Sequence, residues 1–152
     1  MKIPPPARPD FLPAAAILVL LFSMLGACAD RRPVALLSLE MESCSPADAG
    51  YIEKSLLEGL GSRRPVVAPF AVRQQLGEAC AAAACNAETA KALGSSDVFS
   101  GRLSKKEGEW RLRLERYRAK DGANLARSWR ETSVEALAQR ARRGAVELID
   151  AE

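Results

Sequence analysis

The chain has 152 residues, of which 22 are basic, 19 are acidic and none is histidine. Because the basic and acidic residues nearly balance, the charge gives no reason to expect a nucleic-acid partner. The missing histidine removes the usual general base at neutral pH, the usual partner of a catalytic nucleophile and the commonest metal ligand. We therefore expect neither an enzyme nor a protein that carries a metal or another cofactor.

The N-terminal segment has the pattern of an export signal. A weakly basic, proline-rich stretch precedes an apolar run, residues 11–22. That run is shorter than the roughly 20 apolar residues that a membrane-spanning helix needs, and small residues then lead to Cys28. The pattern predicts export across a membrane instead of a membrane span.

Residues 25–28 (LGAC) resemble the bacterial lipobox, in which a branched apolar residue and two small residues precede the cysteine that becomes the lipidated N-terminus. The resemblance implies a stable membrane anchor at Cys28 and a domain in the oxidising periplasm, where disulfides persist. By resemblance to enterobacterial lipoproteins, Ala29 favours the outer membrane over the inner one. The alternative is an ordinary signal peptide in which Cys28 is incidental.

This anchor divides the chain into three predicted parts. Residues 1–27 are expected to be the signal peptide, residues 28–33 the lipidated cysteine with a short tether, and residues 34–152 one folded domain. A domain of that length can bury a core of its own.

The domain begins with a strand and an amphipathic helix. Residues 34–39 (VALLSL) are nearly all apolar, as in a strand buried on both faces. Ser45 and Asp48 have the spacing of a capping box. A helix is therefore predicted over residues 46–60, where apolar residues recur every four positions, and Gly61 ends it.

Two shorter helices and a strand follow. Residues 65–68 (PVVA) predict a second strand, and a brief helix is expected over residues 71–79. Asn86 is in position to cap another helix over residues 87–93, which Gly94 ends. The apolar period then changes from 3.6 residues to 2, which is typical of strands.

Three strands come next. Residues 97–103 predict the first of them, and residues 110–115 alternate apolar with charged side chains, so one face of this second strand is buried. The pair Asp121-Gly122 signals a hairpin turn, after which residues 124–132 return as the third strand.

A last helix is predicted after Ser133, which caps it. The element order is therefore β-α-β-α-α-β-β-β-α, which predicts a single α/β domain with a mixed sheet of about five strands and helices packed on it. If Asp121-Gly122 is the centre of the hairpin turn, Leu114 lies opposite Trp129. Both tryptophans of the chain are expected to pack in the core against the last helix.

The predicted hairpin is rich in arginine: Arg102, Arg111, Arg113, Arg116, Arg118, Arg127 and Arg130. Planar guanidinium groups suit carboxylates and phosphates, so a basic sheet face could bind an acidic protein, lipid headgroups or a glycan. We take Arg111, Arg113 and Arg130 as the candidate partner-binding residues. The alternative is a solvated face on which interleaved glutamates cancel part of the charge.

Four segments resemble the periplasmic domain family typified by the N-terminal domain of TolB. They are residues 34–40 (VALLSLE), 55–60 (SLLEGL), 63–69 (RRPVVAP) and 85–128, the last running from a cysteine through a small-residue helix and a Leu-Gly stop to three strands. Related domains occur in CsgG-type, FlgO-type and LpoB-type lipoproteins. The resemblance implies an accessory or scaffold protein of an envelope machine, and it brings no catalytic residue with it.

Together these features predict a membrane-anchored periplasmic lipoprotein without enzymatic activity that binds another envelope protein. The alternative is binding of an anionic envelope ligand through the arginine-rich hairpin, such as a phosphorylated molecule, a lipid headgroup or a glycan.

Cys80 and Cys85 bracket four alanines. In a continuous helix, Cα atoms five residues apart lie about 8.6 Å from each other, beyond the roughly 7 Å that a disulfide tolerates. A bridge therefore requires a turn between two helices, which Asn86 as a fresh helix cap favours. We predict a Cys80–Cys85 disulfide; a bridge from Cys44 to either one, or free thiols, are the alternatives.

Overall fold

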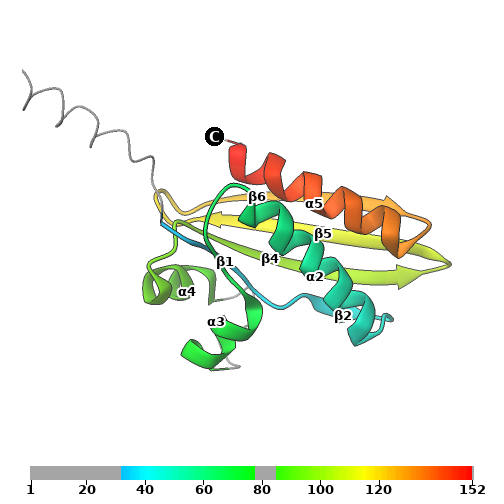
Figure 1. The fold of residues 1–152 in the computed structure, drawn as a ribbon, viewed down its shortest axis with the longest axis horizontal. Helices are drawn as coiled ribbons and strands as arrows, with labels where there is room; N and C mark the ends of the chain where they lie inside the picture. Colours follow the sequence, from blue (N-terminus) through cyan, green and yellow to red (C-terminus); the bar gives the residue numbers. More distant parts are fainter. Residues whose placement is uncertain (1–31, 78–84, 152) are drawn as a thin grey trace, which may run out of the picture. The chain divides into compact units, whose positions relative to one another are not determined.

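A mixed β-sheet organises the part of the chain that this computed structural model describes, residues 32–77 and 85–151 (Figure 1). Its strands are β1 (Val34–Leu36), β2 (Glu40–Glu42), β3 (Val66–Val67), β4 (Asp97–Lys106), β5 (Glu109–Arg118) and β6 (Ala123–Glu131). The helices are α2 (Pro46–Gly61), α3 (Pro69–Leu76), α4 (Asn86–Leu93) and α5 (Val134–Asp150).

The strands lie in the order β3-β1-β4-β5-β6, and β2 also pairs with β4. β1 is parallel to both β3 and β4, and β2 is parallel to β4. The β4–β5 and β5–β6 pairs are antiparallel hairpins. The predicted fold class, a single α/β domain with a mixed sheet, is confirmed.

The predicted first strand, residues 34–39, is shorter in the structure and ends at Leu36. β1 and β2 lie one after the other along β4, and the residues between them are not paired as a strand. Within this gap, Leu39 donates its N–H to Glu53 Oε1 of α2 at 2.8 Å. This acceptor comes from a distant side chain, so the apolar pattern of the segment could not reveal the break.

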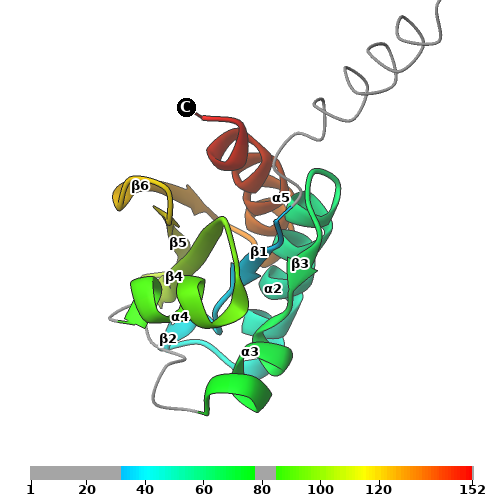
Figure 2. The same cartoon turned by 90° about the vertical axis from the view of Figure 1, so that its left-hand side faces the viewer.

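Helices α2 and α5 lie side by side on one face of the sheet (Figures 1 and 2). Their apolar stripes and the facing strand residues form the main core, which includes Ile52, Leu56, Leu60, Phe99, Leu103, Leu112, Leu114, Leu137, Ala141 and Leu148. Trp110 is buried there, and half-buried Trp129 packs on this core with its ring against Gly144 of α5. The expectation that both tryptophans pack in the core is confirmed.

The start of α2 is the predicted capping box. The Asp48 N–H donates to Ser45 Oγ, and the Ser45 N–H donates to Asp48 Oδ2, each at 3.2 Å. These bonds satisfy backbone donors that a helix leaves without partners in its first turn. The Ser45 hydroxyl and N–H, both bonded to the carboxylate, hold the pKa of Asp48 below its ordinary value.

Helices α3 and α4 cover only part of the opposite face of the sheet. They bury Val72 and Ala90 against Ala35 and Leu37 of the β1 segment and against Val98 of β4. Beyond these residues β4, β5 and β6 extend farther (Figure 1), and within residues 32–77 and 85–151 no other helix packs on this face. In the part of the chain that the structure describes, one face of the hairpins therefore has no helix over it.

The predicted helix cap at Asn86 is wrong. The N-cap residue of α4 is Cys85, and Asn86 is the first residue of the helix. The Asn86 side chain is buried, and its Oδ1 has no hydrogen-bond partner. Gly77, with φ of 73°, ends α3, so two separate helices flank the cysteine segment as expected. Cys80 lies outside the described residues, and the Cys80–Cys85 disulfide stays a prediction.

The register of the second hairpin differs from the expected one. Leu112, not Leu114, lies opposite Trp129, because the last pair of the ladder is Arg118 with Ala123. A four-residue loop therefore joins the strands, and the Asp-Gly pair lies at its end and not at its centre. Asp121 holds this geometry by accepting the Ala123 N–H at 3.0 Å.

Candidate functional site

Four arginines from three strands lie on the uncovered side of the sheet, which we call the open face. Arg102 of β4 lies beside Arg113 of β5, and Arg111 of β5 lies beside Arg130 of β6. Side chains alternate between the two faces of a strand, and those of Leu112 and Leu114 enter the core under α5. The neighbouring Arg111 and Arg113 therefore point away from the core. A shallow depression brings all four arginines together.

The three predicted partner-binding residues, Arg111, Arg113 and Arg130, all lie on this open face. Arg102 of the predicted set joins them there, whereas the other three arginines of the set have different surroundings. Arg116 is buried on the core side, Arg127 faces α5 and pairs with Glu147, and Arg118 pairs with Asp121 at the loop. The structure therefore separates recognition candidates from structural arginines within a single run of sequence.

Glutamates that are exposed or partly exposed accompany three of the open-face arginines. The pairs are Arg102 Nη2 with Glu40 Oε2 at 2.8 Å, Arg111 Nε with Glu109 Oε2 at 2.7 Å and Arg113 Nε with Glu115 Oε1 at 2.8 Å. By accepting two hydrogen bonds, Glu40 holds the pKa of Arg102 above its ordinary value. Exposed pairs of this kind contribute little to stability, so a partner's carboxylate can replace the intramolecular one.

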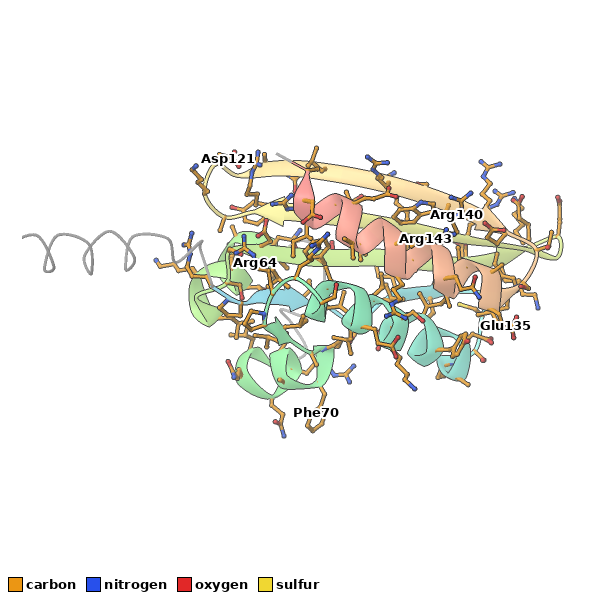
Figure 3. All side chains as sticks on the ribbon, turned by 45° about the horizontal axis from the view of Figure 1, so that its top comes forward. Arg64, Phe70, Asp121, Glu135, Arg140 and Arg143 are labelled. Carbon is orange, nitrogen blue, oxygen red and sulfur yellow. The ribbon has the colours of Figure 1, made fainter. Side chains whose placement is uncertain are left out.

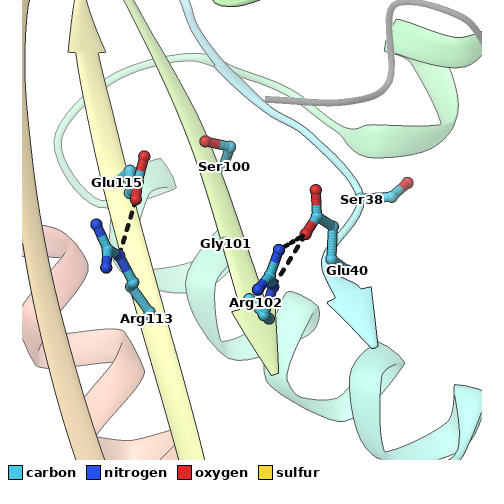
Figure 4. Close-up of a pocket in the computed structure, with 7 residues that line it drawn as sticks. All are labelled: Ser38, Glu40, Ser100, Gly101, Arg102, Arg113 and Glu115. Carbon is cyan, nitrogen blue, oxygen red and sulfur yellow. Dashed lines mark hydrogen bonds and ion pairs between the residues drawn. The ribbon is translucent and has the colours of Figure 1, made fainter. Parts of the chain in front are cut away.

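A cavity of about 280 Å³ opens on this face between β4, β5 and the segment after β1. Figure 4 shows Arg102 and Arg113 at its rim, each turned toward its own glutamate. Ser100 also lines the cavity; this residue is only 3% exposed, and its Oγ has no hydrogen-bond partner. A buried hydroxyl without a partner costs stability.

The charge of the domain is concentrated in the two hairpins. Residues 97–131 contain ten basic and six acidic residues, whereas the remaining described residues contain nine of each. Figure 3 shows Arg140 and Arg143 on α5, on the helix-covered side of the sheet, away from the open face. A surface excess of positive charge at one part of a domain attracts acidic partners and speeds their association.

The other sequence-predicted sites fall outside this region. Cys28 precedes the described residues, so its lipidation stays a prediction. Cys44 is half-buried, and its Sγ lies 3.4 Å from Leu103 O as a weak donor. Among residues 32–77 and 85–151, no group of three or more potential metal ligands lies together, and no helix is long and apolar enough to cross a membrane.

This sheet, with three parallel pairs around β1 and β4, two antiparallel pairs around β5, and α2 and α5 on one face, is an α/β fold that bacterial lipoproteins also adopt. The C-terminal domain of LpoB from Salmonella enterica matches it with a TM-score of 0.54 at 15% identity, over 76% of this chain and 94% of that one. Lipoprotein GNA1162 from Neisseria meningitidis matches with a TM-score of 0.52 at 14% identity, over 78% of this chain and 97% of that one.

The C-terminal domain of LpoB from Escherichia coli matches similarly, with a TM-score of 0.50 at 15% identity, over 76% of this chain and 94% of the other. No protein-family model matches the chain, and no curated protein matches its sequence. The predicted fold relationship to LpoB-type domains is thus confirmed by structure alone.

Proposed function

We propose that the chain is a lipid-anchored accessory protein of the bacterial envelope, without enzymatic activity, whose domain binds another envelope protein through the open face. The observation that carries this proposal is a sheet face over which no helix of the described residues packs, and on which Arg102, Arg111, Arg113 and Arg130 gather. Arginine is enriched in protein interfaces because its planar fork binds carboxylates at two points and its stem buries apolar area.

The charge distribution supports an acidic partner surface. The hairpins carry the entire excess of basic residues in the described part of the chain. In the described part of the chain, no acidic side chain forms an ion pair with Arg130. A partner can therefore bind this guanidinium without breaking an existing pair. The three paired arginines would exchange one exposed carboxylate for another, at little cost.

A small anionic ligand in the cavity beside Ser100 is the second candidate. The unpartnered Ser100 hydroxyl favours some polar ligand group there. However, Glu40 and Glu115 neutralise both arginines of the cavity rim, which weakens the field that a small phosphate or carboxylate would experience. An extended protein surface that reaches all four arginines therefore fits better.

The envelope location rests on the lipobox-like residues 25–28, and the occurrence of this fold in a lipoprotein supports it. Replacing Cys28 with serine is expected to release the protein from the membrane fraction, because the anchoring acyl chains are lost. Cell fractionation and the mass of the mature N-terminus would measure this. The control, Cys44→Ser, changes a half-buried thiol and should leave the protein in the membrane fraction. A Cys28→Ser protein that stays there would refute the anchor.

Charge reversal on the open face is expected to abolish partner capture. The double variant Arg111→Glu/Arg130→Glu changes two neighbouring residues that belong to neither core cluster. Crosslinking of the intact lipoprotein in its own envelope, followed by mass spectrometry, should show partner recovery reduced by about tenfold or more, as for the loss of close charge contacts.

The matched control for this variant is Lys54→Glu, an exposed reversal on α2, on the helix-covered side of the sheet. It should leave partner recovery unchanged. Equal recovery by the double variant and the unmodified protein would show that the partner binds elsewhere. Equal loss in both variants would point to a nonspecific effect of net charge.

A further inference from the structure

Among the strands of the described residues, β6 is a free edge of the sheet. It has nine residues and stands at the end of the strand order, with β5 as its neighbouring strand. Figure 2 shows no other strand beyond it. Its pairing with β5 is one-to-one from Ala123 to Glu131, without a bulge, and β6 contains no proline. Edge strands of this length usually contain a bulge or a proline, because their unpaired N–H and C=O groups can pair with another strand.

The hydrogen-bonding pattern shows which residues form the free edge. The Ala119 N–H, just after β5, donates to Ser96 O, just before β4. In an antiparallel pair, successive residues direct their backbone groups alternately to one side and the other. Odd-numbered residues of β5 therefore bond to β4, and even-numbered residues bond to β6.

The register of β5 and β6 then assigns the outward groups. Leu112 bonds to Trp129 and Leu114 to Arg127. The even-numbered residues of β6 consequently direct their N–H and C=O groups away from β5: they are Asn124, Ala126, Ser128 and Arg130. Since side chains alternate too, these same residues carry their side chains on the open face.

We propose that an extended acidic segment of the partner protein adds to β6 as a further strand. This proposal rests on the proposed function and specifies how the open face is used. Main-chain bonds to the four outward residues would supply affinity, and side chains would supply selectivity, as in other cases of strand addition. Alternate side chains of the added strand would lie next to Arg130 and Ser128 on one face and next to Arg127 on the other.

Charge favours an acidic segment over a second copy of the chain at this edge, because β6 carries two arginines and one glutamate. A second copy of the chain that paired β6 with β6 symmetrically about Arg127 would place the two Arg127 side chains opposite each other. Like charges directly opposite destabilise a strand pair. An acidic segment instead meets Arg127 and Arg130 with opposite charge, in a hairpin region where basic residues outnumber acidic ones by ten to six.

Amide hydrogen exchange on the full-length protein in detergent micelles tests this directly. The probe is a synthetic peptide that alternates glutamate with valine, and the matched control peptide has lysine in place of glutamate. The acidic peptide should slow exchange at Asn124, Ala126, Ser128 and Arg130 by at least about tenfold. The amides of Arg127 and Trp129, already bonded to β5, should not change. Absence of protection at the four outward amides would overturn the proposal.

A proline substitution separates strand addition from binding to the face. Ser128→Pro removes an outward N–H that the β5 ladder does not use, and edge strands tolerate proline at such positions. It should abolish the protection and reduce peptide binding at least about tenfold, with the β4–β5 amides still protected. Ala126→Pro is the second variant if Ser128→Pro loosens the hairpin.

The outcomes distinguish this inference from the proposed function. If Arg111→Glu/Arg130→Glu weakens peptide binding and both proline variants bind normally, the face binds acidic chains but strand addition is wrong. If neither the charge-reversal variant nor the proline variants weaken peptide binding, both proposals are wrong. Equal protection by the lysine peptide would overturn the acidic preference. A dimer in solution that the proline variants dissolve would assign the edge to a second copy.

Discussion

Arg116→Ala is expected to lower the free energy of unfolding by about 3–5 kcal/mol, the usual cost of removing one partner from a buried ion pair. The side chains of Arg116 and Asp97 are 7% and 4% exposed. Arg116 Nε donates to Asp97 Oδ1 at 2.6 Å. Without the guanidinium, the Asp97 carboxylate stays buried without its counter-charge, which is the main source of the loss.

Arg116 also closes the end of α5. Its Nη1 donates to Leu148 O and Ala151 O, each at 2.6 Å. The last carbonyls of a helix have no partners within the helix, so the guanidinium supplies one from the sheet. The substitution should therefore raise amide exchange in the last turn of α5 as well as lower global stability.

The matched control is Arg113→Ala on the same strand. Arg113 is paired with Glu115 on the open face, where an exposed ion pair contributes less than about 1 kcal/mol. Chemical denaturation of both variants, with folding checked by circular dichroism, measures the difference. Similar losses for the two arginines would contradict the assignment of Arg116 as a buried structural residue.

The alternation of apolar and charged residues in β5 already indicated that Arg116 is buried. Trp110, Leu112 and Leu114 define the buried face of the strand, and Arg116 is the next position on that face. A charged residue that continues a buried pattern requires a partner in the core. The composition of the hairpin nevertheless groups Arg116 with the exposed arginines, because its acidic partner, Asp97, is on another strand.

Local patterns predicted the elements that depend on neighbouring residues. The capping box at Ser45 and the exposure of Arg111 and Arg113 follow from spacing of a few positions, and both agree with the structure. The features that sequence did not reveal depend on distant contacts. Where the predicted first strand ends early, the Leu39 N–H donates to Glu53 of α2. At the hairpin, the loop with Asp121 gives a register that differs by two residues from the expected one.

The accessibility of the open face also depends on distant contacts that the sequence did not reveal. Alternation indicates which arginines leave the core, but not whether another layer covers them. Coverage depends on where α3 and α4 pack, and they reach only as far as Val98 and its neighbours. The candidate site was therefore predictable as a set of side chains, whereas its accessibility required the tertiary structure.

Two glycines of α2 should respond oppositely to the same substitution. Gly59→Ala is expected to destabilise the domain by about 2 kcal/mol, the range for overpacking a tight contact. A Cβ atom at Gly59 would lie 2.5 Å from Arg142 O and 3.2 Å from Arg142 C of α5. These are backbone atoms, which cannot rotate away as a side chain can, so α2 and α5 would have to separate and loosen the main core.

Gly50→Ala is the control because it changes the helix but not the packing. Gly50 is exposed, and a Cβ atom there would meet nothing within 4 Å. The gain in helix propensity should stabilise the domain by about 0.5–1 kcal/mol. Thermal and denaturant unfolding of the two variants should therefore move in opposite directions from the unmodified protein. Stabilisation by Gly59→Ala would mean that α2 and α5 are not in backbone contact at this crossing, and that the interface tolerates an added methyl group.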